Sequence, residues 1–172
     1  PFSDVANTAS LMTREFSSQV DGLTYDPGRP SGLVNIDQER AINVHRPTSI
    51  KPLKGDAQIF LDFMEHVFPN EVERSVVMRW CATLIAKPER RMLYGLMLIS
   101  ETQGVGKTTL GESILAPLVG WDNVSVPDQH EVTDSSFNDW MARVRLVLIH
   151  EIYAGENKKA YDRLKSVITE KF

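Results

Sequence analysis

Apolar side chains along this chain follow three different spacings, and each spacing predicts a different kind of element. In residues 56–91 they recur three and four positions apart, which is typical of amphipathic helices, and Pro69-Asn70 divides the stretch into two. Residues 1–20 show a looser version of the same period and predict a further helix. In residues 21–55, short β-prone runs flank a turn-rich segment, which predicts a small β-ribbon followed by a linker.

Two continuous apolar runs, Leu96–Ile99 and Leu146–Ile149, predict strands, and the second of them is expected to be buried on both faces of a parallel sheet. Further segments separate and follow them in the order expected of alternating β and α units. These segments are a helix over 109–118, a short strand over 122–126, a helix around 135–141 and a final helix over 156–170. The sequence therefore predicts an α/β fold, with helices on both faces of a parallel sheet in a three-layer core that begins near residue 92.

The hydrophobic content is sufficient for a folded core, and the net charge bears on the kind of partner that the chain can bind. Hydrophobic residues make up 42% of the 172 residues and the net charge is −4, so we expect any contact with nucleic acid to be local rather than spread over a basic face. No run approaches the ~18 apolar residues of a membrane span, and we expect no signal peptide. The single cysteine, Cys81, excludes an internal disulfide and fits a reducing compartment, so we expect a buried thiol in a cytoplasmic protein.

The segment Glu101–Thr109 has the residue types of a phosphate-binding loop between a strand and a helix. Glycines at 104 and 106 allow positive φ, so that neighbouring N–H groups can form a nest for an anion. We expect Lys107 between the β- and γ-phosphates of ATP and Thr108 on Mg²⁺. Glu101 stands where the usual pattern has its first glycine, and a glycine turn with an exposed lysine is the alternative interpretation. The expected ATP-binding residues are Gln103, Gly104, Val105, Gly106, Lys107, Thr108 and Thr109.

The other half of an ATPase site requires a carboxylate, and Glu151 supplies one at the end of the second apolar run. Because open α/β sheets bind ligands at the carboxyl ends of their strands, we expect Glu151 to orient the attacking water, to be catalytic together with Lys107, and to serve the metal together with Thr108. A strand-end glutamate that faces solvent is the alternative. His150 stands where many NTPases carry an acid. Since imidazole is a poor ligand for Mg²⁺, we expect His150 to form hydrogen bonds behind the site or to end the strand.

Taken in order, these motifs resemble the superfamily 3 helicase domain of phage and plasmid primases and primase-polymerases, and more distantly poxvirus primase-helicases. The resemblance covers roughly residues 40–172 and depends on order and spacing, since only the phosphate-binding loop is specific by itself. The matching segments are 43–47 with its Asn and Pro, 82–88 at the end of the helical pair, 103–108, the helix that runs to Val119-Gly120, Phe137–Trp140, the strand before Glu151, and 164–169.

The resemblance implies an AAA+-like core that assembles into a ring, usually a hexamer, and couples Mg-ATP hydrolysis to movement along single-stranded DNA. It puts Lys165 at the start of a segment that leads to a DNA-contacting loop. It also implies an upstream primase or polymerase domain, in a phage- or plasmid-encoded protein of the host cytoplasm. Because the sequence ends at Phe172, before the family's sensor strand and arginine finger, we expect a truncated core with little ATPase activity of its own.

Three parts and one leading function follow from these patterns. The parts are an N-terminal helix, β-ribbon and linker over 1–55, a helical subdomain over 56–91, and the truncated ATPase core over 92–172. The leading function is the ATPase core of a replicative DNA helicase. The alternatives are a non-unwinding AAA+ ATPase, such as a DNA loader or remodeller, and a P-loop small-molecule kinase, which usually has an arginine-rich lid. An interaction module with a degenerate loop is disfavoured by the intact Lys107-Thr108 pair.

Overall fold

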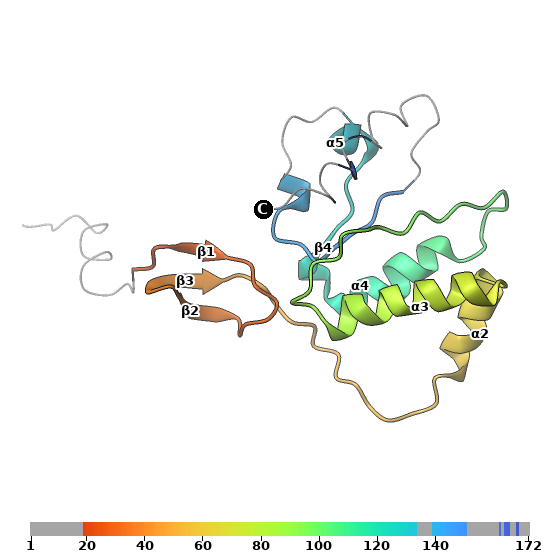
Figure 1. The fold of residues 1–172 in the computed structure, drawn as a ribbon, viewed down its shortest axis with the longest axis horizontal. Coiled ribbons are helices and arrows are strands. Elements are labelled where there is room, and N and C mark those ends of the chain that lie inside the picture. The colour runs from red at the N-terminus through yellow and green to blue at the C-terminus, as the bar shows by residue number, and fades with distance from the viewer. Residues whose placement is uncertain (1–18, 134–138, 151–161, 163, 166–167, 169–172) are drawn as a thin grey trace, which may run out of the picture. The chain divides into compact units, whose positions relative to one another are not determined.

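The structure, a computed structural model, describes residues 19–133, 139–150, 162, 164, 165 and 168 (Figure 1). The chain divides into two compact units, residues 1–45 and residues 46–172. Most of the helix predicted over 1–20 lies outside the described residues.

The first unit contains a three-stranded sheet in the order β1-β3-β2 (Figure 1). β2 and β3 are antiparallel, with Ile36 opposite Glu39, whereas β1 runs parallel to β3. Asp37 and Gln38 join β2 to β3, and both have positive φ, as a tight hairpin turn of this kind requires. The β-ribbon predicted between residues 21 and 55 is therefore confirmed, with strands β1 (Gly22–Thr24), β2 (Gly32–Ile36) and β3 (Glu39–Asn43).

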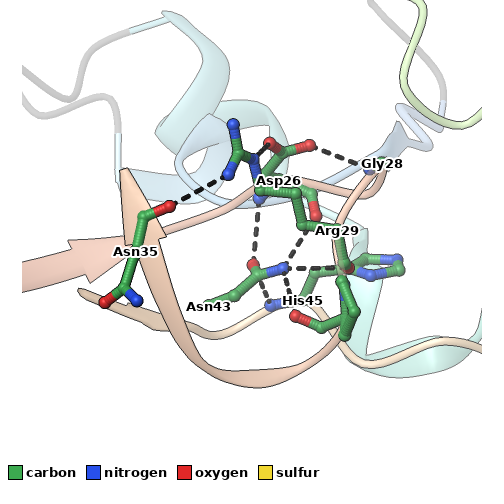
Figure 2. Close-up of polar contacts among 7 residues, drawn as sticks. Asp26, Gly28, Arg29, Asn35, Asn43 and His45 are labelled. Atoms are coloured by element: carbon green, nitrogen blue, oxygen red, sulfur yellow. Dashed lines mark hydrogen bonds and ion pairs between the residues drawn. The ribbon is translucent and has the colours of Figure 1, made fainter. Parts of the chain in front are cut away.

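A buried side-chain amide, that of Asn43, organises the loop between β1 and β2 (Figure 2). Its Oδ1 accepts hydrogen bonds from the backbone N–H groups of Asp26, at 3.0 Å, and His45, at 3.2 Å. Its Nδ2 donates to the backbone oxygens of Asp26, Arg29 and Pro30, at 2.8, 3.1 and 3.0 Å. One side chain thus satisfies backbone groups that the turn-rich loop cannot pair within a sheet.

Asp26 and His45 complete this hub. The Asp26 carboxylate accepts from the backbone N–H of Gly28, at 2.8 Å, and from Nε of Arg29, at 2.9 Å (Figure 2). The His45 ring meets Tyr25 edge to face, with ring centroids 5.5 Å apart. Burial lowers the pKa of the His45 imidazole, and the nearby Asp26 carboxylate opposes that effect.

The second unit begins with the helical pair that the apolar spacing predicts. The Asn70 side chain caps the second helix by accepting from the N–H groups of Val72 and Glu73, at 2.9 and 3.2 Å, which is why the chain turns at Pro69-Asn70. Both predicted helices are confirmed, as α2 (Gln58–Val67) and α3 (Glu71–Ala86).

The core of this unit forms where α3 meets the helix after the phosphate-binding loop and the strand at 146–147. Cys81 is one of the buried residues, and burial raises the pKa of its thiol to about 11, so the expectation of a buried thiol is confirmed. The buried core residues are Met64, Val77, Trp80, Cys81, Leu84, Leu110, Leu115, Val119 and Leu146.

The segment before the loop differs from its prediction. Residues 92–100 belong to no strand in the described structure, although a strand over 96–99 was expected. Leu96 and Leu98 pack against the core, whereas Met97 is 76% exposed and Ile99 is 83% exposed. Covered and exposed side chains thus alternate along the segment, as they do in an extended chain that packs one face against a core. The expected strand is wrong, because a strand needs a hydrogen-bonded neighbouring strand, and none of the described residues forms a strand pairing with this segment.

The helix after the loop is confirmed and has an unexpected geometry. Lys107 and Thr108 are helical, a π-helix covers Thr109–Leu115, and α4 (Ala116–Val119) ends at Gly120, which has a φ of +89°. α3 and α4 lie beside each other (Figure 1). A run of seven π-helical residues is rare, and π-bulges within helices occur frequently at functional sites.

A two-stranded parallel sheet follows, in which Val124 is opposite Leu146 and Ser125 is opposite Val147. The predicted parallel pairing is confirmed, but the strands are shorter than expected, and a three-layer core around a central sheet is not present among the described residues. Only scattered residues of the predicted helix over 156–170 are described, and those are helical. The remaining elements are a 3-10 turn at Trp121–Asn123, β4 (Val124–Ser125), α5 (Gln129–Thr133), a 3-10 turn at Asp139–Met141 and β5 (Leu146–Val147).

In the part of the chain that the structure describes, no helix has both the length and the apolar character needed to cross a bilayer.

Replacing Asn43 by alanine should destabilise the first unit by about 2 kcal/mol, because the variant leaves several buried backbone groups without a partner. Hydrogen exchange of the backbone amides of residues 22–43 measures this loss as faster exchange. Asn35→Ala, an exposed change on β2 of the same sheet, is the matched control and should leave exchange nearly unchanged. Equal protection in the two variants would contradict the role given to the Asn43 amide.

Candidate nucleotide-binding site

The backbone of the loop at 101–109 has positive φ at two positions. Gly104 has a φ of +77° and Gly106 a φ of +102°, so both take the conformation that glycine adopts readily. The helix begins directly afterwards, and the N–H of Leu110 donates to the oxygen of Gly106 at 2.9 Å. Because the seven predicted ATP-binding residues are contiguous, the structure keeps them together. Gln103, Gly104, Thr108 and Thr109 are exposed, and Val105, Gly106 and Lys107 are partly exposed.

The ammonium group of Lys107 is held at the base of the loop. Its Nζ donates to Oγ of Ser100 at 2.5 Å, and Ser100 Oγ in turn donates to the backbone oxygen of Thr102 at 2.7 Å. These contacts tie the start of the loop to the start of the helix. Sequence reasoning missed Ser100, although a hydroxyl at the end of an apolar run, directly before a glycine loop, is a signal that could have found it.

Helix α2 packs directly against the loop. A Cβ atom added at Gly106 would lie 3.0 Å from Cε2 of Phe63 and 3.0 Å from Cγ2 of Val67. The apolar stripe of α2 therefore faces the phosphate-binding loop as well as the core. Nothing in the sequence links residues 63 and 106, so this contact depends on the tertiary fold alone.

The end of β5 packs against the same helix. The N–H of Leu148 donates to the oxygen of Ser125 at 2.8 Å, which extends the β4–β5 pairing by one residue. Gly111 allows the helix to approach, since a Cβ there would lie 3.1 Å from Cδ2 of Leu148. Two residues further on, Nε2 of His150 lies 2.7 Å from Oε1 of Glu112.

His150 thus makes a side-chain contact of the kind expected for a hydrogen-bonding residue. Sequence reasoning missed its partner, Glu112. The predicted catalytic residue Glu151 lies outside the described residues, directly after His150. Lys165 is an exposed helical residue. Among the described residues no three His, Cys, Asp or Glu side chains cluster as a metal site.

The donor set of the loop fits a magnesium–nucleotide complex. It combines two glycines with positive φ, a lysine ammonium group at the start of a helix and the exposed hydroxyl of Thr108. Such a set can hold phosphate oxygens by backbone N–H groups and one cationic side chain, and it offers a hard oxygen ligand to Mg²⁺.

A methyl group at Gly106 should destabilise the second unit more than one at Gly104. Both glycines have positive φ, so each Gly→Ala change carries a backbone cost of about 1–2 kcal/mol. At Gly106 the methyl also meets Phe63 and Val67, which adds about 1–3 kcal/mol of overpacking, whereas no atom lies within 4 Å of a Cβ at Gly104. Urea denaturation measures both variants, and equal midpoints would show that α2 does not press on the loop.

Comparison with known proteins gives one family match and several similar folds. The model of DUF5906, a family of unknown function, matches residues 98–172, which include the whole loop at 101–109 and β5. No curated protein has a sequence that matches this chain.

The fold is similar to solved structures of the NrS-1 C-terminal region. The apo structure of that region, spanning its residues 305–718, has a TM-score of 0.70 and 23% sequence identity, over 86% of this chain and 36% of that one. An A-form apo structure of the region has a TM-score of 0.67 and 24% identity over the same shares. The chain therefore spans about a third of the length of these structures, and the likeness at this level of identity establishes the fold.

Proposed function

We propose that this chain carries the ATP-binding part of a motor that acts in DNA replication, of the primase-helicase type. The observation that carries the proposal is the loop itself, in which Gly104 and Gly106 have positive φ and Lys107 begins a helix. The similarity in fold to the NrS-1 C-terminal region supports a role in replication. The order of motifs, which resembles that of superfamily 3 helicases, supports the more specific assignment to a helicase.

In this proposal the loop residues hold the phosphates of ATP. The N–H groups of Val105, Gly106 and Lys107 face the anion, and the helix N-terminus adds its dipole. Lys107 exchanges its hydrogen bond to Ser100 for contacts with the β- and γ-phosphates. Thr108 gives its hydroxyl to Mg²⁺, which, when bound with ATP, supplies positive charge that offsets the negative charge on the phosphates.

Further roles are proposed for residues outside the loop. Glu151 follows His150, which packs near the helix after the loop, and in this proposal its carboxylate orients the attacking water. Lys165 contacts single-stranded DNA, and copies of the protein assemble into a ring, the hexamer implied by the resemblance, beside an upstream primase or polymerase domain. The alternatives are a DNA loader or remodeller and a small-molecule kinase. Strand displacement coupled to ATP turnover would favour the helicase over both.

Lys107→Ala should abolish binding of Mg-ATP or weaken it at least tenfold, because a charge-assisted contact to the phosphates is lost. Isothermal titration of the purified chain with Mg-ATP measures the affinity. Lys54→Ala, which removes an exposed lysine from the linker before α2, is the matched control and should bind as the wild type does. Wild-type affinity in the Lys107 variant would remove the basis of the proposal.

Glu151→Gln should keep ATP binding and lose turnover, since the amide preserves the shape of the side chain but cannot act as a base toward water. Phosphate release, in a form of the protein that turns over ATP, measures the loss, and titration with ATP measures retained binding. Glu89→Gln, an exposed change in the turn after α3, serves as the control. Turnover that persists in the Glu151 variant would leave this residue without a catalytic role.

A further inference from the structure

We propose that Glu112 supplies the acidic group that serves the metal side of the nucleotide site, with His150 as the residue that positions it. This inference rests on the proposed function, because it concerns the same loop and helix. Its basis is the 2.7 Å contact between His150 Nε2 and Glu112 Oε1, which joins the end of β5 to the helix that begins at the phosphate-binding loop.

Glu112 lies on the helix four residues after Thr108, so the two side chains lie about one turn apart along the same face. Thr108 is the residue whose hydroxyl is expected to contact the metal ion. Glu112 also lies in the middle of the π-helix Thr109–Leu115, a geometry that occurs frequently at functional sites.

His150 follows β5 at the carboxyl end of that strand, which is where open α/β sheets bind their ligands. Two contacts of Leu148 hold the end of β5 in place. Its N–H donates to the oxygen of Ser125, and its side chain packs closely against Gly111. Because a larger residue at 111 would push the helix away from β5, the glycine is what allows His150 to reach Glu112.

The chemistry of the His150 and Glu112 side chains favours the same assignment. Many NTPases carry an acid at the strand position that His150 occupies, and an imidazole cannot replace it as a ligand for a hard cation. A carboxylate has two oxygens, so Glu112 can accept from His150 through Oε1 and still direct Oε2 to a water molecule held by the metal. The side chains of His150 and Glu112 are 43% and 39% exposed, which leaves the pair accessible to solvent and to a bound ion. In this arrangement the acidic group is Glu112, on the helix after the loop, and not a residue at the strand position that His150 occupies.

Glu112→Gln separates a metal-related role from a structural one, because the amide oxygen still accepts a hydrogen bond from His150 while the negative charge is lost. Isothermal titration with ATP, in excess Mg²⁺ and separately in EDTA, gives the affinity with and without the metal. We expect the Mg²⁺-dependent gain in affinity to fall at least tenfold in Glu112→Gln, with the affinity in EDTA unchanged. Glu89→Gln, an exposed change in the turn after α3, is the charge-matched control.

Two further variants keep the test decisive. Adding His150→Asp to Glu112→Gln returns an acid to the strand end and should restore the Mg²⁺ dependence. His150→Asn alone, which leaves Glu112 but removes the imidazole that holds it, should reduce that dependence by a smaller factor.

The inference is overturned if Glu112→Gln keeps the full Mg²⁺-dependent gain, or if it lowers the affinity equally in Mg²⁺ and in EDTA, which is the signature of a purely structural contact. Failure of the proposed function is distinguishable, because in that case the wild-type chain itself binds no ATP. Wild-type binding together with an unaltered Glu112→Gln variant would remove only the role of the Glu112–His150 pair.

Discussion

Everything in the candidate site depends on the burial of one helix, the one that begins at Lys107. Leu110 and Leu115 are almost fully buried, and Ala116 is completely so. Burying a leucine side chain stabilises a fold by about 1.5–3 kcal/mol, so these contacts fix the helix against α3 and β5. The first turn of this helix adjoins the loop, with the N–H of Leu110 bonded to the oxygen of Gly106, so the packing of the helix also positions the loop.

Two elements that are distant in the sequence pack against this helix and the loop before it. α2 presses on the loop at Gly106, and the end of β5 presses on the helix at Gly111. In both places a glycine allows an approach that a side chain would prevent. The consequence is that the loop and the strand end, the two halves of the proposed ATP site, are both tied to this helix.

The first unit is stabilised in a different way. Its sheet is small, and several of its apolar side chains are exposed, including Leu23, Leu33 and Ile42. A buried amide, that of Asn43, compensates by pairing with five backbone groups of the adjoining loop and strand end. Hydrogen bonding to one side chain therefore sets the loop conformation, which apolar burial alone would leave undetermined.

The sequence by itself determined the features that depend on near neighbours in the chain. The apolar spacing predicted α2 and α3, and Asn70 marked the boundary between them. Gly104, Gly106 and Lys107 predicted the loop, because positive φ and a helix start are local properties. Tertiary structure alone decided the contacts of Phe63 with Gly106 and of Glu112 with His150, and it left the run at 96–99 with one face exposed. The physical reason is that packing and strand pairing join residues far apart in the chain, so the spacing of one segment cannot specify which other segment covers it.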